Sequence, residues 1–329
     1  MKNFVKIFIF AICLISPSTV LAAKIGDLTH ISIQDQAIRF WQLKDPTVRI
    51  ALIGSILLGV SCGLLGVFTV VRKESLLGDT LSHAVLPGIC IGFLLTLSKS
   101  PWALFIGATF AGIIGIAALQ GITRFTNLKI DTAMGLVLTG FYGIGICLLT
   151  MIQKLPVGTQ AGLDKFLFGQ AAALSLEDLY FMGIICVALL INIKLFYKEL
   201  LLISFDNTFA SCITMPRKFL NAFLLLLLAL TIVISIKAVG VVLVSAILIM
   251  PAATAMLLTN KFSNVILLSV ILAVAAAIIG SFFSFLAHNL PTGPFIVVSA
   301  FFFFGLAFIF SPKQGLLKRW WLGRHRAIH

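Results

Sequence analysis

The longest apolar run of the chain is FLNAFLLLLLALTIVISIKAVGVVLVSAILIMPAATAMLL, residues 219–258, in which Lys237 is the one charged side chain. A membrane-crossing helix needs about 20 mainly apolar residues, because the hydrocarbon core is about 30 Å thick. The stretch is therefore long enough for two crossings, at 219–236 and 239–258. Pro251 is expected to break the second helix, and Met250 beside it is either a soft metal ligand or, more simply, packing.

The same apolar pattern recurs along the whole chain. Of its 329 residues 60% are hydrophobic and 11% are charged, and its mean hydropathy is +1.14. A soluble protein carries about 25% charged residues, so much of the surface of this protein must face the lipid of a membrane. We predict an all-α integral membrane protein, a polytopic bundle of about nine transmembrane helices. Besides the two above, the predicted spans are 48–71, 76–97, 101–122, 132–152, 178–196, 264–287 and 294–310.

The basic residues orient the predicted bundle. The formal net charge is +13, but no basic patch interleaved with exposed aromatic residues is present, which argues against nucleic-acid binding. With the start of the mature chain outside, 14 lysines and arginines fall on one side of the membrane and 8 on the other. Cytoplasmic loops carry the excess. The segment 153–177 is therefore predicted to lie outside, and the basic tail 313–329 in the cytoplasm.

Two segments precede the first span. Residues 1–22 have the form of a signal peptide, with Lys2 and Lys6 before an apolar stretch and a small-residue site ending at Ala22. The alternative is an uncleaved anchor helix. Residues 23–47 mix apolar and polar side chains and are predicted to lie outside, at the membrane surface.

The second predicted span contains the clearest candidate for chemistry. It includes GDTLSHAVLPG, residues 78–88, in which Asp79 and His83 are four residues apart and share one helix face. A carboxylate and an imidazole suit Mn(II), Fe(II) or Zn(II), and Pro87 and Gly88 are expected to weaken the helix beside them. The alternative is a carboxylate at a helix end that hydrogen-bonds a structural histidine. Residue chemistry alone leaves both interpretations open.

Other features are less specific. Asp131 begins the fourth span and is interpreted as a capping carboxylate. The loop 197–218 is predicted to contain a short amphipathic helix, either a docking element or a connector. The six cysteines form no metal or disulfide pattern. No Gly-x-x-x-x-Gly-Lys, His-Glu-x-x-His or Gly-x-Ser-x-Gly motif is present, so we predict no enzyme and no ATP site of that type on this chain.

Several blocks together resemble the permeases of manganese, zinc and iron ABC importers, in order from about residue 48 to 312. The blocks are VVRKESLLGDTLSHAVLPGICIGFLL (70–95), KIDTAMGLVL (129–138), AGLDKFLFGQAAALS (161–175), FDNTFA (205–210), AVGVVLVSAILIMPAATAMLLT (238–259) and LPTGPFIVV (290–298). The resemblance implies that 48–312 is a transmembrane domain like that of a type II ABC importer, in the cytoplasmic membrane of a bacterium.

The resemblance also implies cargo, partners and site residues. The cargo would be a divalent Mn, Zn or Fe ion, with no permanently bound cofactor. The partners would be a cytoplasmic ABC ATPase dimer, a second permease subunit in a homodimer or heterodimer, and an extracytoplasmic metal-binding protein. Asp79 and His83 would line the ion path. The ATPase-coupling loop would include Phe205, Asp206, Phe209 and Ala210.

The chain departs from the family pattern at two places. Thr214 stands where the family usually has glycine, and Asn289 stands where an aspartate is common. Two other functions stay open: a siderophore or cobalamin ABC permease, which would need a wide apolar channel, and an ion-coupled metal carrier that works without an ATPase. The residues do not choose among Mn(II), Fe(II) and Zn(II), because Asp and His bind all three.

Overall fold

A computed structural model describes residues 40–42, 45–97, 100–154, 169, 171, 174–205, 216–286 and 291–311. The described elements are all helices: α3 (Pro46–Val71), α4 (Leu76–Thr96), α5 (Pro101–Phe125), α6 (Ile130–Gln153), α8 (Leu176–Leu195), α9 (Tyr197–Phe205), α11 (Arg217–Val239), α12 (Val241–Leu258), α13 (Phe262–Leu286) and α14 (Thr292–Phe310). Among them, nine are long and apolar enough to cross a membrane. The nine predicted spans are thus confirmed, with ends shifted by up to three residues.

Local chemistry explains where several helices begin. Prolines open α3 and α5, at Pro46 and Pro101, because a proline fits the first helical turn, where no N–H donor is needed. The α8 helix begins two residues before the predicted span because Ser175 and Asp178 form a reciprocal capping box. Between α11 and α12 lies Gly240 with φ of 94°, a backbone conformation that favours glycine.

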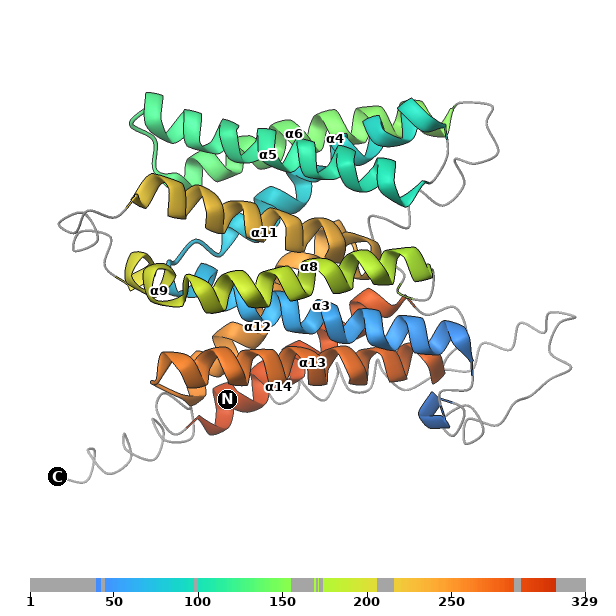
Figure 1. The fold of residues 1–329 in the computed structure, drawn as a ribbon, viewed down its shortest axis with the longest axis vertical. Coiled ribbons are helices and arrows are strands. Elements are labelled where there is room, and N and C mark those ends of the chain that lie inside the picture. The colour runs from blue at the N-terminus through green and yellow to red at the C-terminus, as the bar shows by residue number, and fades with distance from the viewer. Residues whose placement is uncertain are drawn as a thin grey trace, which may run out of the picture.

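The helices pack side by side in one bundle. Figure 1 shows α4, α5 and α6 grouped at the top, α13 and α14 at the bottom, and α3, α8 and α11 between them. The α3 and α13 helices approach closely at Gly63, whose carbonyl accepts a 2.7 Å hydrogen bond from the Ser269 hydroxyl. A Cβ atom on Gly63 would come within 2.9 Å of the Val270 Cα, so a small residue is needed there.

Burial differs strongly between neighbouring helices. In the most apolar 18-residue window, 83% of α4 is buried inside the bundle but only 22% of α6. The α6 helix therefore has a broad face that no described part of this chain covers. Cys62, Cys90 and Cys186 are buried as small core residues, whereas Cys147 lies exposed on α6.

The predicted helix breaks at Pro87–Gly88 and at Pro251 are wrong, because neither helix is interrupted there. The α4 helix continues through Pro87 and Gly88, and α12 continues through Pro251. A proline inside a helix removes one backbone hydrogen bond, and packing by neighbouring helices can compensate for that loss in a membrane protein. All three residues are buried.

Several predictions lie wholly or partly outside the described residues. These are the signal peptide 1–22, most of the interfacial segment 23–47, most of 153–177, Thr214, Asn289 and the tail 313–329. Of the interfacial segment, Phe40 is described. Its buried ring packs edge-on against Phe282 of α13, with centroids 5.2 Å apart.

Candidate functional site

The α4 helix places Asp79 and His83 together, as the sequence predicts. Asp79 lies in the first turn of α4, where a carboxylate favours the positive end of the helix dipole, and His83 follows one turn later. His83 Nε2 is 3.5 Å from Asp79 Oδ1, and the two side chains are 12% and 36% exposed, respectively. The histidine is thus mostly buried, and the carboxylate is open on one side.

The separation between these two atoms matters for their chemistry. An N–H···O hydrogen bond spans about 2.7–3.2 Å, so 3.5 Å is too long for a good one. Two donors that each bind one tetrahedral ion at about 2.1 Å lie about 3.4 Å apart. The pair is therefore spaced as two ligands of one ion would be. Without an ion, its two groups interact weakly.

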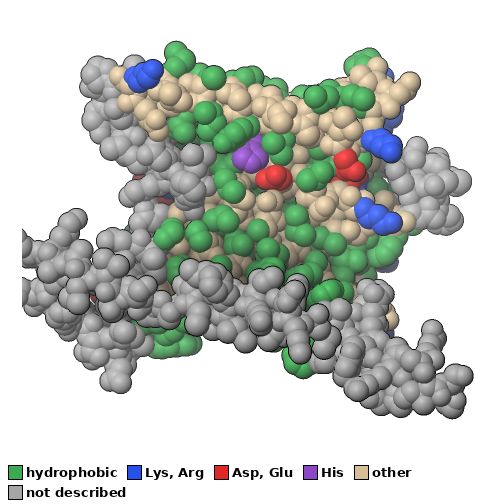
Figure 2. All heavy atoms as spheres, turned by 180° about the vertical axis from the view of Figure 1, so that it is seen from behind, with side chains coloured by type: hydrophobic (Ala, Val, Ile, Leu, Met, Phe, Trp, Pro, Cys, Tyr) green, Lys and Arg blue, Asp and Glu red, His purple; other side chains and the backbone are tan. Residues whose placement is uncertain are grey.

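Few side chains near the pair are charged. Figure 2 shows one face of the molecule with a histidine beside a carboxylate among hydrophobic and uncharged side chains, while another acidic side chain and the basic side chains lie nearer the edges. Within the described residues, no three His, Cys, Asp or Glu side chains are grouped closely enough to hold a metal ion. The described part of one chain thus supplies two side-chain donors, which is fewer than a complete site requires.

The backbone next to the pair offers a further oxygen. Pro87 has no N–H, so the carbonyl of His83, four residues earlier, cannot receive its usual helical hydrogen bond. A carbonyl oxygen is a hard ligand that suits Mn(II) and similar ions. The sequence Asp-x-x-x-His-x-x-x-Pro therefore places within two turns of α4 a carboxylate, an imidazole and a carbonyl that lacks its usual helical donor.

Tyr142 is a neighbour of the pair that sequence reasoning missed. It lies on α6, and its ring packs edge-to-face against the His83 imidazole, with centroids 4.8 Å apart and planes at 79°. The other imidazole nitrogen, Nδ1, is buried and has no hydrogen-bond partner among the described residues. No sequence pattern could have paired these rings, since they come from different helices 59 positions apart.

The remaining predicted residues are separate from this pair or lie outside the described residues. Asp131 is exposed in the first turn of α6, where it suits the helix dipole. Phe205 ends α9 and packs edge-on against Phe262 of α13, with centroids 5.3 Å apart. The other predicted coupling residues, Asp206, Phe209 and Ala210, lie outside the described residues.

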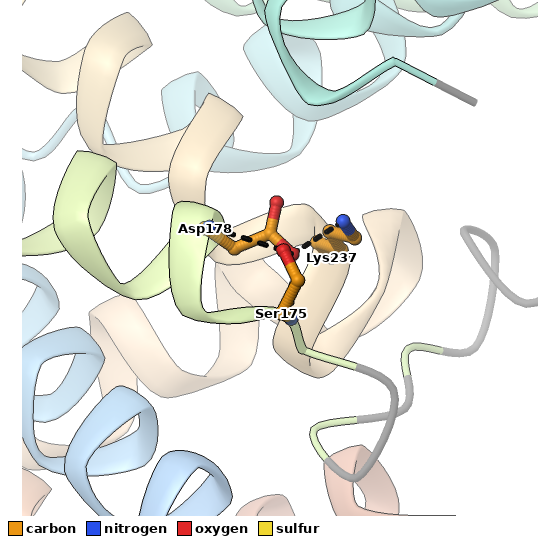
Figure 3. Close-up of polar contacts among 3 residues, drawn as sticks. All are labelled: Ser175, Asp178 and Lys237. Carbon is orange, nitrogen blue, oxygen red and sulfur yellow. Dashed lines mark hydrogen bonds and ion pairs between the residues drawn. The ribbon is translucent and has the colours of Figure 1, made fainter. Parts of the chain in front are cut away.

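A second acid–base pair lies elsewhere in the bundle (Figure 3). Lys237 Nζ, near the end of α11, is 2.5 Å from Asp178 Oδ2, in the first turn of α8. The same oxygen accepts hydrogen bonds from the Ser175 hydroxyl at 2.6 Å and the Ser175 N–H at 2.8 Å. The Ser-x-x-Asp spacing could have revealed the capping box, but nothing local points to Lys237 as its partner.

This second pair borders a largely apolar cavity between α5, α8 and α11. The cavity has a volume of about 60 Å³, and Phe105, Phe181 and Val233 contribute to its wall beside Asp178 and Lys237. Neither Asp79 nor His83 lines it. The cavity therefore belongs to the packing around the second pair and not to the candidate metal ligands.

Comparison with known proteins gives concordant matches. A model of the ABC 3 transport family matches residues 44–311. The manganese transport system membrane protein MntC of Bacillus subtilis (strain 168) is 41% identical over 275 residues, which is 84% of this chain and 63% of that protein. The zinc transport system membrane protein TroC of Treponema pallidum (strain Nichols) is 36% identical over 284 residues, covering 86% of this chain and 95% of the relative.

A solved structure has the same fold. The structure of PsaBC from Streptococcus pneumoniae in complex with Fab aligns with a TM-score of 0.76 and 34% sequence identity. The alignment covers 87% of this chain and 99% of the solved chain. The order and packing of the helices described above thus agree with those of a membrane protein of known structure.

Proposed function

Because the chain belongs to the ABC 3 transport family, we propose that it is the membrane-spanning permease subunit of an ATP-driven importer of divalent transition-metal ions. The names of the relatives support this proposal, since they refer to manganese and zinc transport system membrane proteins. The nine membrane-length helices supply the necessary architecture. The absence of a P-loop motif from the sequence agrees with ATP hydrolysis on a separate subunit.

The observation that carries the proposal is the Asp79–His83 pair, whose carboxylate is 36% exposed. An ionisable pair that faced lipid would be costly, so this face is expected to meet water or protein. A second copy that presents the same face would bring four side-chain donors together. The two Asp79 carboxylates, one from each copy, would also balance the charge of a divalent cation. This geometry favours a metal path between two permease subunits.

In this path the ion is bound transiently. The Asp79 carboxylate and the His83 imidazole replace water molecules as the ion enters, and the unpaired carbonyl of His83 can replace another. Asp79 is 36% exposed, so water can compete with it for the ion. A site that retains some water releases its cargo more readily than a closed structural site does.

The proposed partners act on opposite sides of the membrane. An ABC ATPase dimer docks on the cytoplasmic side, on α9 and the loop that follows it. An extracytoplasmic binding protein delivers the ion from outside, and a second permease copy or a related subunit completes the membrane domain. The proposed location is the cytoplasmic membrane of a bacterium, with no permanent cofactor on the permease.

The two other transporter functions fit the site less well. A siderophore or cobalamin permease needs a wide apolar channel, and an Asp–His pair on its wall would have no evident role. An ion-coupled carrier would need no ATPase and would be expected to have more carboxylates inside the membrane. Among the nine described membrane-length helices, the carboxylates are Asp79 in α4, Asp131 in α6, and Glu177 and Asp178 in α8. All four lie in the first turn of their helices, and Lys237 already pairs with Asp178.

Metal content and energy dependence test the proposed function together. Deletion of the gene should lower the cellular content of Mn, Zn or Fe in metal-poor medium, measured by inductively coupled plasma mass spectrometry, and a plasmid copy should restore it. Uptake into vesicles should require ATP on the cytoplasmic side. Uptake of the free ion driven by a proton gradient without ATP would contradict the proposal, as would loss of siderophore uptake alone.

The coupling loop is tested by a separate variant. Phe209→Asp should reduce uptake and weaken co-purification of the ATPase, because an apolar docking contact is replaced by a charge. The amount of permease in the membrane should not change. Leu195, an exposed residue on α8, offers the control Leu195→Ala, for which we expect normal co-purification. Normal ATPase binding by Phe209→Asp would show that this loop is only a connector.

A further inference from the structure

The orientation of the His83 ring lacks its usual support. A histidine that binds a metal commonly donates its second ring N–H to a carboxylate or carbonyl, which fixes the ring. The side chain of His83 is only 12% exposed, yet its Nδ1 atom has no hydrogen-bond partner among the described residues. The ring must therefore be held mainly by packing.

Tyr142 provides that packing from α6. Its ring meets the imidazole edge-to-face, with centroids 4.8 Å apart, an arrangement that aromatic rings prefer. Side chains on a helix lean towards its N-terminus, so Tyr142 covers the turn of α6 that precedes it.

The backbones of α4 and α6 fix the position of Tyr142. A Cβ atom on Gly145 would lie 2.6 Å from Leu86 Cδ2, so the lack of a side chain lets α6 approach α4 there. Near the start of both helices, the Thr80 hydroxyl donates to the Leu76 carbonyl at 2.9 Å and also lies 3.4 Å from the Met134 carbonyl of α6, a close contact between the two helices. These contacts lie on either side of Tyr142 along α6 and hold its ring over His83.

The exposure of Tyr142 also indicates that it lies beside the proposed ion path. Tyrosine is enriched at the two membrane surfaces, but Tyr142 lies midway along α6, which runs from Ile130 to Gln153, and 41% of it is exposed. A phenol hydroxyl that faced lipid at this depth would lack a partner. Its position beside the Asp79–His83 pair instead places it at the edge of the proposed ion path.

We propose that Tyr142 is a positioning residue, whose ring holds the His83 imidazole with Nε2 towards Asp79 and so sets the affinity for the ion. This inference rests on the proposed function of the pair. The aromatic ring performs the role, and the hydroxyl does not, because the contact described is between rings. Tyr142 does not itself bind the metal.

The test compares Tyr142→Ala, Tyr142→Met and Tyr142→Phe in the complete importer. Initial uptake rates are measured against the concentration of Mn(II), Zn(II) or Fe(II), each supplied alone. Loss of the ring should raise KM about 10-fold or more, as loss of support for a metal-bound histidine commonly does, with little change in Vmax. Tyr142→Phe should behave as the unchanged protein. Tyr180→Ala is the control, since Tyr180 is an exposed tyrosine on α8.

Each outcome bears on the inference. An unchanged KM for Tyr142→Ala, a fall in Vmax alone, or a defect in Tyr142→Phe would each overturn it. Tyr142→Met keeps the bulk of the side chain without the ring, so it serves if the alanine variant fails to accumulate. His83→Gln is measured alongside. If His83→Gln loses uptake while Tyr142→Ala does not, only this inference fails; if His83→Gln is normal, the proposed path itself fails.

Discussion

The two acid–base pairs of this molecule, Asp178–Lys237 and Asp79–His83, differ in how many polar contacts their carboxylates receive. Asp178 is 10% exposed and receives three short polar contacts, from Lys237 and from the hydroxyl and N–H of Ser175. Asp79 is 36% exposed, its nearest ionisable partner is His83 at 3.5 Å, and no described residue donates a hydrogen bond to its carboxylate. The Oδ2 atom of Asp178 is thus fully occupied, whereas the carboxylate of Asp79 is available.

That difference separates a structural pair from a binding pair. A mostly buried carboxylate oxygen with three polar contacts is costly to disturb and has no free position for an ion. A partly exposed carboxylate whose oxygen lies 3.5 Å from the Nε2 atom of an imidazole has room for one. We therefore expect changes in the Asp79–His83 pair to affect transport, and changes in the Asp178–Lys237 pair to affect stability.

The largest expected effect is that of Asp79→Asn on transport. The amide keeps the size of the side chain but loses the charge that attracts a divalent cation. Uptake should fall by more than about 100-fold, because removal of a ligand should cost at least as much as removal of its outer-shell support. Amount in the membrane and thermal stability in detergent should stay normal. Asp131→Asn, at the exposed start of α6, is the control and should retain uptake.

The second pair should show the opposite behaviour. Asp178→Ala leaves Lys237 without its partner and removes the side-chain half of the α8 capping box, and breaking such a pair costs about 3–5 kcal/mol. The temperature at which the protein unfolds or aggregates in detergent should fall clearly, as followed by intrinsic fluorescence. Uptake per folded molecule should change little. A large loss of uptake with unchanged stability would place Asp178 on the transport path instead.

Pro87→Ala tests whether the backbone carbonyl of His83 contributes to the site. An alanine N–H can donate to the His83 carbonyl, so this oxygen would no longer be unpaired. We expect uptake to fall by up to about 10-fold, in line with loss of a supporting contact at a metal site, while stability stays normal or rises. Pro251→Ala in α12 makes the same chemical change away from the pair and should retain uptake. Equal effects of both variants would mean that a general change in the helices, and not the His83 carbonyl, causes the loss of uptake.

The smallest effect is expected for Lys237→Gln. Asp178 keeps both of its hydrogen bonds from Ser175, so the loss should be about 1–3 kcal/mol, the range for one hydrogen bond to a charged group. The fall in unfolding temperature should be smaller than that of Asp178→Ala. If the two variants are equally destabilised, the capping box contributes little and the ion pair holds the α8–α11 contact alone.

The sequence predicted the features that depend on local pattern. The nine spans follow from apolar runs of membrane length, and the Asp79–His83 pair follows from a four-residue spacing on one helix. Such patterns relate only residues that lie close together in the sequence. Tyr142 meets His83 only because α4 and α6 pack in one register at Gly145, and Lys237 meets Asp178 only because α11 ends beside the start of α8. No short sequence motif predicts how α4 packs against α6 or how α11 packs against α8.

The incorrect helix breaks have a related cause. Proline lacks an N–H whatever surrounds it, so one helical hydrogen bond is lost at Pro87 and one at Pro251. Whether the helix also stops depends on the packing around the residue. Both prolines are buried within continuous helices. The loss therefore remains local, and at Pro87 it falls on the carbonyl of the candidate ligand His83.

Transport by His83→Gln is the most direct test of the central claim that the Asp79–His83 pair binds the ion. Glutamine keeps the bulk and hydrogen-bonding capacity of the side chain but binds Mn(II), Zn(II) and Fe(II) far more weakly than imidazole does. Uptake of each ion by the reconstituted importer is measured with matched protein amounts and ATPase association. The account predicts a sharp loss of uptake with normal stability. Uptake close to that of the unchanged protein would contradict it and would make His83 a structural residue.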